Sequence, residues 1–82
     1  MDNTVFQEMV ERWKSPVVAR TEIEIFTGGA MKEKYIANLD SAGLGPKRFR
    51  LGRKIVYPIR ALVAWLESRS AAIEERHHEA EA

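Results

Sequence analysis

Residues 47–57 have the sequence KRFRLGRKIVY, which predicts a β-hairpin. Basic and apolar side chains alternate before Gly52 and Arg53, which supply a two-residue turn. Because successive side chains of a strand point to opposite faces, we expect one apolar and one cationic face. The expected inward residues are Phe49, Leu51, Ile55 and Tyr57, and the expected outward cations are Arg48, Arg50 and Lys54.

The residues after the hairpin predict a helix that closes the core. Pro58 suits the first turn of a helix, where its missing N–H has no intrahelical partner. Apolar residues then follow at i, i+3, i+4 and i+7, with Trp65 beside them. These apolar residues are Ile59, Leu62, Val63 and Leu66.

Two short helices are predicted before the hairpin. Thr21 and Glu24 have the spacing of a capping box, so a helix of about two turns should begin there and bury Ile23 with Ile25 or Phe26. Gly28-Gly29 ends it, because glycine readily adopts the positive φ of a tight reversal.

The second of these helices is predicted over residues 31–42, with Gly43 after it. Its expected inward residues are Met31, Tyr35, Ile36 and Leu39, and its expected outward residues are Lys32, Lys34 and Asn38. Two short helices joined by a glycine turn, the second with basic and amide side chains on its open face, have the outline of a helix-turn-helix.

A further helix is predicted over residues 4–14, ended by Ser15-Pro16. Its apolar face holds Val5, Phe6, Met9, Val10 and Trp13. This face either completes the core or packs against a second subunit as a homodimer contact. Val17-Val18 is predicted to be a short extended segment.

The basic residues are concentrated in the middle of the chain. The whole sequence has a net charge of +1, whereas residues 32–60 hold eight basic and two acidic side chains, a local net charge of +6. Such a block attracts polyanions, and double-stranded DNA presents a regular array of phosphates. Candidates for base edges in the major groove are Lys32, Lys34 and Asn38, and candidates for phosphates or the minor groove are Lys47, Arg48, Arg50, Arg53 and Lys54.

Composition argues against several other classes. The chain has no cysteine, which removes disulfides and thiolate metal sites and favours the cytoplasm. Its longest dense apolar run, residues 61–66, is far too short to cross a membrane. We expect no enzyme and no cofactor, because 82 residues leave little room for a pocket and no glycine-rich phosphate loop is present.

The last residues, 70–82, are rich in alanine and glutamate and predict either an acidic tail or a helix extension. His77-His78 does not indicate a metal site, because adjacent side chains on a helix point about 100° apart.

Several motifs occur in a characteristic order. Thr21-Glu22 opens a short helix, Gly43 precedes Pro46, Leu51-Gly52-Arg53-Lys54 forms the turn, and Ala64-Trp65-Leu66-Glu67 lies in the last helix. This order resembles the excisionase and AlpA-like group of MerR-type winged helix-turn-helix proteins over about residues 17–69. The resemblance implies a winged helix-turn-helix with a small β-hairpin over those residues. The helix over residues 4–14 lies outside the family's usual minimal domain, and together they predict one mainly helical domain over residues 1–69.

The resemblance also implies a function. The helix over residues 31–42 would enter the major groove, and the hairpin over residues 47–57 would form the wing on the adjacent backbone or minor groove. The chain would then be a phage or mobile-element regulator, acting in transcription or as an excision factor beside a recombinase.

This sequence departs from the family where the recognition helix opens. Met31-Lys32-Glu33-Lys34 stands where the family usually has serine or threonine around a basic residue. Glu33 adds a charge that phosphate repels. Together with the acidic tail, it favours an alternative: a protein-interaction module on the same scaffold that docks a recombinase, polymerase or packaging protein.

Overall fold

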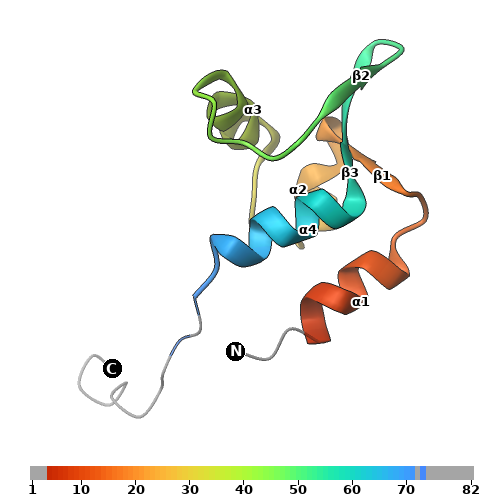
Figure 1. The fold of residues 1–82 in the computed structure, drawn as a ribbon, viewed down its shortest axis with the longest axis vertical. Coiled ribbons are helices and arrows are strands. Elements are labelled where there is room, and N and C mark those ends of the chain that lie inside the picture. Colours follow the sequence, from red (N-terminus) through yellow and green to blue (C-terminus); the bar gives the residue numbers. More distant parts are fainter. Residues whose placement is uncertain (1–3, 72, 74–82) are drawn as a thin grey trace.

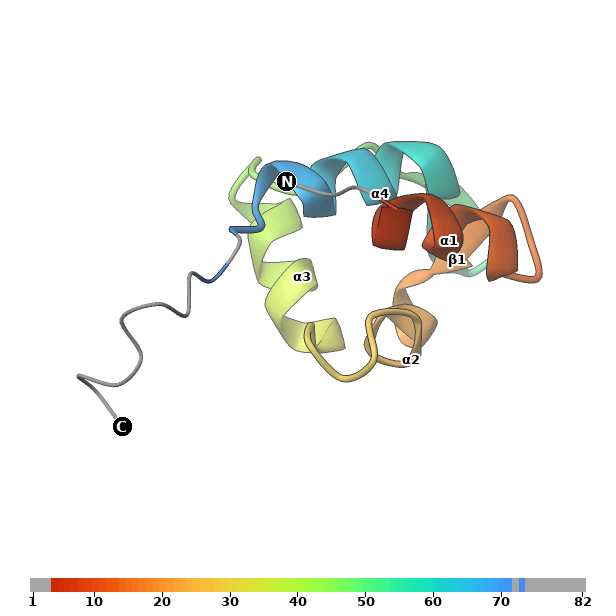
Figure 2. The same ribbon diagram turned by 90° about the horizontal axis from the view of Figure 1, so that it is seen from below.

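The computed structural model describes residues 4–71 and residue 73, which form four α-helices, one 3-10 turn and a three-stranded antiparallel sheet (Figure 1). Their order is α1 (Thr4–Arg12), β1 (Val17–Ala19), η1 (Arg20–Glu22), α2 (Ile23–Phe26), α3 (Glu33–Ser41), β2 (Phe49–Leu51), β3 (Lys54–Pro58) and α4 (Ile59–Ser68). Figure 2 shows α1 alongside α4, with α2 across the molecule from them. The fold is mixed α/β, because the segment predicted as extended adds a third strand to the hairpin.

The sheet has β3 in its centre, between β1 and β2. The turn at Gly52, which has a φ of 65°, places Leu51 opposite Lys54. Arg50 therefore pairs with Ile55, and Phe49 pairs with Val56. On the other side of β3, Val18 of β1 pairs with Tyr57.

This register contradicts the predicted faces of the hairpin. Residues directly opposite in an antiparallel pair project to the same face, so Phe49 shares its face with Val56 rather than with Ile55. The apolar residues of β2 consequently lie on the opposite face from Tyr57. Phe49 is 43% exposed and Leu51 is 58% exposed, so neither packs into the core as predicted.

The core lies between the helices and the face of the sheet that carries Tyr57. Its buried residues are Val18, Ile23, Ile36, Tyr57, Ile59, Leu62 and Val63. The predicted spacing of the last helix is confirmed, since α4 contributes three of them. Burying each large apolar side chain contributes about 1.5–3 kcal/mol, so these contacts dominate the stability.

α1 packs its partly buried Phe6, Met9 and Val10 against this core. It ends at Arg12, two residues earlier than predicted, and Trp13 lies outside the helix. The Trp13 indole N–H donates to the carbonyl of Val17 at 3.0 Å, and its ring meets Phe26 edge to face at 5.0 Å. The indole N–H and the ring of Trp13 thus both have partners within the same chain.

The predicted capping box does not form. Arg20–Glu22 makes a 3-10 turn and α2 has a single turn, with no side-chain bond at the N-cap of either one. Ile23 is buried and Phe26 is partly buried, but Ile25 is 77% exposed. The predicted reversal at Gly28-Gly29 is confirmed, with φ values of 66° and 88°.

α3 begins at Glu33 rather than at residue 31. The Thr27 hydroxyl accepts the backbone N–H of Met31 at 3.0 Å, and Lys32 is extended, so the chain enters the helix late. Tyr35 is 47% exposed and not inward as predicted, because Ile36 occupies the inward position one residue later.

No helix in the described ranges is long and apolar enough to span a lipid bilayer. Most of the predicted tail, including His77-His78, lies outside the described residues.

Candidate nucleic-acid interface

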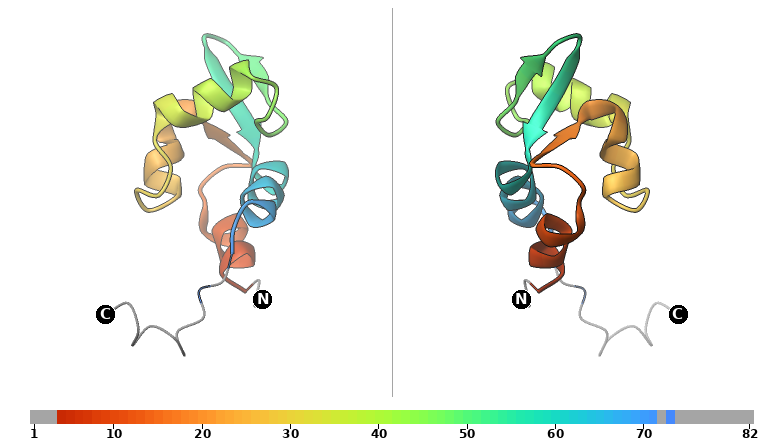
Figure 3. Two further views of the ribbon diagram at one scale, coloured as in Figure 1. Left: turned by 90° about the vertical axis from the view of Figure 1, so that its left-hand side faces the viewer. Right: turned by 90° about the vertical axis from the view of Figure 1, so that its right-hand side faces the viewer.

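α3 and the β2–β3 hairpin (residues 49–58) lie at one end of the molecule, and α1 lies toward the other (Figure 3). Between α3 and the hairpin is a shallow groove of about 200 Å³. It is lined by Arg20, Thr21, Glu33, Arg53, Lys54 and Ile55. The first turn of α3 and the turn of the hairpin therefore border one surface.

All eight candidate residues lie at the exposed surface. Five of the candidate cations form no ion pair within the described residues: Lys34, Lys47, Arg50, Arg53 and Lys54. Arg50 lies opposite Ile55 in the register and so faces the same side as Tyr57, toward α3. Arg53 and Lys54 border the groove itself. Asn38 lies on α3 one turn after Lys34.

Lys32 is placed differently from its prediction. It precedes α3 as the residue at the helix N-cap, and its Nζ lies 2.6 Å from Oε2 of Glu24. Both side chains are well exposed, so this ion pair contributes at most about 1 kcal/mol. A competing phosphate can therefore displace Glu24 at small cost.

Arg48 is engaged inside the protein. Its guanidinium donates to the carbonyl of Pro46 at 3.3 Å and to the backbone carbonyl of Asp40 at 3.1 Å. The same group lies 3.6 Å from Oδ1 of Asp40. The position predicted as an outward cation thus braces the end of α3 against the segment that leads into the hairpin.

Asp40 is the centre of a buried polar cluster that the sequence analysis missed. It is 5% exposed and lies in the last turn of α3. Its Oδ2 accepts a hydrogen bond from the Tyr57 hydroxyl at 2.6 Å and one from Nη2 of Arg20 at 2.5 Å. Nε of Arg20 also donates to the Tyr57 hydroxyl at 3.1 Å. The cluster ties α3 to η1 and to the central strand, which sets the angle between helix and hairpin.

One signal in the sequence points to this cluster. Asp40 follows Ile36 by four residues, and residues four apart share one face of a helix. An acidic residue on the inward face of a helix needs a cationic partner. The partner, Arg20, lies twenty residues earlier, and nothing in local sequence identifies it.

The protonation of this cluster follows from its burial. Burial of the phenol raises the pKa of Tyr57 to about 12, and its bond to Asp40 acts in the same direction, against the bond from Arg20. The bond to Tyr57 is the largest cause that raises the pKa of the Arg20 guanidinium. At neutral pH the cluster therefore contains a neutral phenol and a charged guanidinium.

Gly45 lies directly against this cluster. A Cβ at this position would come within 1.8 Å of Oδ1 of Asp40 and 3.2 Å of its Cα. Among the described residues, Oδ1 has no hydrogen-bond partner. The absence of a side chain at Gly45 thus allows the loop after α3 to close over the carboxylate.

The surface between α3 and the hairpin presents cations around one carboxylate, Glu33. This arrangement can hold a polyanion along its rim and repels negative charge at the first turn of α3. Among the described residues, no group of three or more histidines, cysteines or acidic residues is close enough to hold a metal ion. Comparison of the chain with models of protein families, with curated proteins and with solved structures found no match.

Proposed function

We propose that this chain binds double-stranded DNA as a winged helix-turn-helix domain, with α3 in the major groove and the hairpin as its wing. One observation carries the proposal: an exposed helix and a hairpin meet at one groove, and Lys34, Arg50, Arg53 and Lys54 form no ion pair within the described residues, whereas Arg20 and Arg48 are paired with Asp40 and Lys32 with Glu24. Cations without internal partners are available to neutralise phosphates.

α3 supplies the residues for sequence discrimination. Lys34 and Asn38 are four residues apart and share one exposed side of the helix. Asparagine can pair with adenine through two hydrogen bonds, and lysine can donate to guanine. Lys32 precedes the helix, and in this arrangement its ammonium would contact a phosphate at the edge of the DNA major groove.

The hairpin supplies the phosphate contacts. Arg50 faces α3, and Arg53 stands at the turn, where an arginine can enter a narrow minor groove. Lys54 and Lys47 extend the positive rim. Four phosphate contacts correspond to a slope of about −4 for log affinity against log salt, at about −0.9 each.

The order of motifs supports a more specific role, that of a phage or mobile-element regulator in the cytoplasm. Such a protein acts as a transcription factor or as an accessory factor that bends DNA beside a recombinase.

Fluorescence anisotropy with a random duplex over a series of salt concentrations tests the proposal. We expect binding at low salt with a slope near −4, and a double variant, R50Q/R53Q, should flatten the slope by about 2. The matched control R12Q removes a positive charge from α1 and should leave the slope unchanged. Absence of binding at low salt, or an unchanged slope in the double variant, would refute the assignment.

A second candidate function is supported by the exposed apolar side chains of β2. Phe49 and Leu51 lie on the face of the hairpin that points away from Tyr57, where they offer a contact for another protein. On this hypothesis the scaffold docks a recombinase, polymerase or packaging protein. The same low-salt experiment separates the two, because a module that binds only protein leaves random duplex free.

A further inference from the structure

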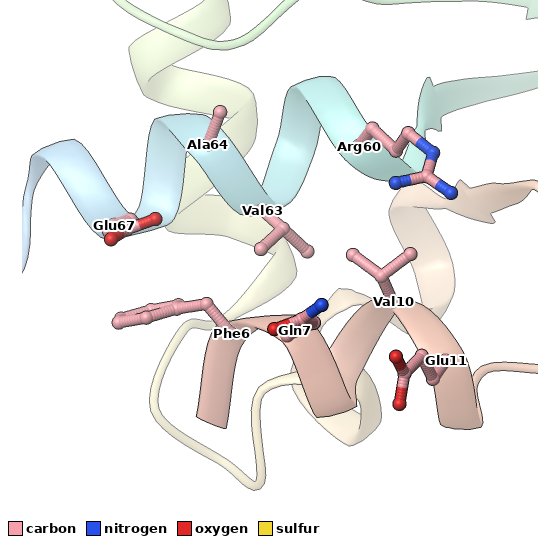
Figure 4. A pocket seen from close by; sticks show the side chains of 8 residues that line it. All are labelled: Phe6, Gln7, Val10, Glu11, Arg60, Val63, Ala64 and Glu67. Atoms are coloured by element: carbon pink, nitrogen blue, oxygen red, sulfur yellow. The ribbon is translucent and has the colours of Figure 1, made fainter. Parts of the chain in front are cut away.

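A second groove lies between α1 and α4, away from the hairpin (Figure 4). Its volume is about 470 Å³. Its floor is apolar, formed by Phe6 and Val10 from α1 and by Val63 and Ala64 from α4. Phe6 and Val10 remain partly exposed although they pack against the core. Gln7, Glu11, Arg60 and Glu67 line the rest of the groove, so it is a mixed apolar and charged surface that the described part of the chain leaves uncovered.

Three charges border this groove: Arg60 and Glu67 at its two ends, and Glu11 of α1 at the same end as Arg60 (Figure 4). Arg60 and Glu67 both belong to α4, and Figure 4 shows them at opposite ends of the hollow. They are seven residues apart, so they lie on one side of the helix and about 10 Å apart along its axis. Within the described residues, neither forms an ion pair.

We propose that a second copy of this chain covers the groove in a two-fold symmetric dimer, with the two α4 helices antiparallel. A two-fold axis perpendicular to α4 near Val63 and Ala64 brings Arg60 of each copy opposite Glu67 of the other. Arg60 and Glu67 of each copy then both have an ion-pair partner, and the apolar residues of the two grooves are buried between the two copies. Ala64 is exposed and small, so the two helices can approach closely at the axis.

The charge pattern favours a second copy over an unrelated protein. An arginine and a glutamate equally spaced about the centre of one helix complement themselves after a two-fold rotation, without any other sequence being required. The groove also lies away from α3 and the hairpin, so this dimer leaves both exposed (Figure 3). The dimer does not depend on the proposed function.

The dimer should be weak. Two helices of nine and ten residues lying side by side measure about 15 Å by 20 Å, which is well below the roughly 800 Å² per partner of a stable interface. We therefore expect association at concentrations of about 10–1000 μM, weakening as salt is added.

Charge reversal tests the proposal by sedimentation equilibrium without DNA. R60E and E67R should each self-associate at least about tenfold more weakly, because two attractions become two repulsions. An equimolar mixture of R60E and E67R should form a heterodimer about as tight as the original dimer, since it again has two ion pairs, one unchanged and one with reversed sign. The double variant R60E/E67R should again form a homodimer.

Three results would overturn the proposal. The first is a protein that remains monomeric at about 1 mM. The second is a mixture of R60E and E67R that associates no better than either variant alone. The third is complementation of R60E by E11R instead of E67R, which would place α4 of one copy against α1 of the other. Circular dichroism of each variant checks that all of them fold.

Discussion

The Asp40 cluster predicts a large loss of stability in the variant Y57F. The Tyr57 side chain is fully buried, and its hydroxyl both donates to Asp40 at 2.6 Å and accepts from Arg20 at 3.1 Å. Each bond to a charged partner contributes about 1.5–3 kcal/mol, and the Asp40 carboxylate keeps only one close donor. We expect the free energy of unfolding to fall by about 3 kcal/mol, of the roughly 4–12 kcal/mol typical of a domain this size.

Urea unfolding followed by circular dichroism measures this loss. The transition midpoint should move to lower urea while the slope stays the same, because the surface exposed on unfolding is unchanged. The control is Y35F, which removes the same atom from a residue 47% exposed and should cost less than about 0.5 kcal/mol. If Y57F and Y35F unfold at the same urea concentration, the cluster does not stabilise the fold and the argument fails.

Three further predictions concern the cluster and the groove. Because the pKa of Tyr57 is raised to about 12, its stabilisation is complete below pH 10 and disappears as the pH rises from 10 to 12, at about 1.4 kcal/mol per pH unit. Absorbance titration of the Y35F variant checks this, and a tyrosinate midpoint near pH 10 in folded protein would contradict it. The variant G45A should lower the free energy of unfolding by about 1–3 kcal/mol, since its Cβ would overlap Oδ1 of Asp40, and the loss should shrink in a D40A background. Removing the groove carboxylate in E33Q should strengthen duplex binding by up to about fivefold at low salt, and weaker binding in the anisotropy assay would count against the proposed orientation of α3.

The sequence predicted most elements because their signals are local. Proline and glycine mark the ends of segments, and the spacing of Ile59, Leu62 and Val63 identifies the buried side of α4 without reference to any other part of the chain. Helix ends were less accurate. α3 starts two residues late because the Thr27 hydroxyl caps Met31, a bond that depends on how the preceding turn folds.

The faces of the hairpin show an error that local reasoning could have avoided. A two-residue turn at Gly52 and Arg53 requires Leu51 to stand opposite Lys54, so Phe49 and Ile55 must lie on different faces. The prediction used the alternation of side chains within each strand correctly. It did not use the register between the strands, which decides which side chains of β2 and β3 share a face.

For the candidate interface, the sequence established which side chains are exposed cations, because charged residues in a short chain rarely lie buried without partners. It could not establish which of them are free. Arg48 is held by Asp40, and Lys32 by Glu24, each eight residues away along the chain, through contacts that depend on how the intervening turn folds.

Composition and periodicity alone were sufficient to identify the helices, the hairpin and the basic block, since each follows from residues within a few positions of one another. The angle between α3 and the hairpin depended on the folded chain, because Arg20, Asp40 and Tyr57 are 17 to 37 residues apart and meet around one buried carboxylate. Burying that charge is favourable only when all its hydrogen-bond partners are in place in the folded chain, and no short stretch of sequence contains them all.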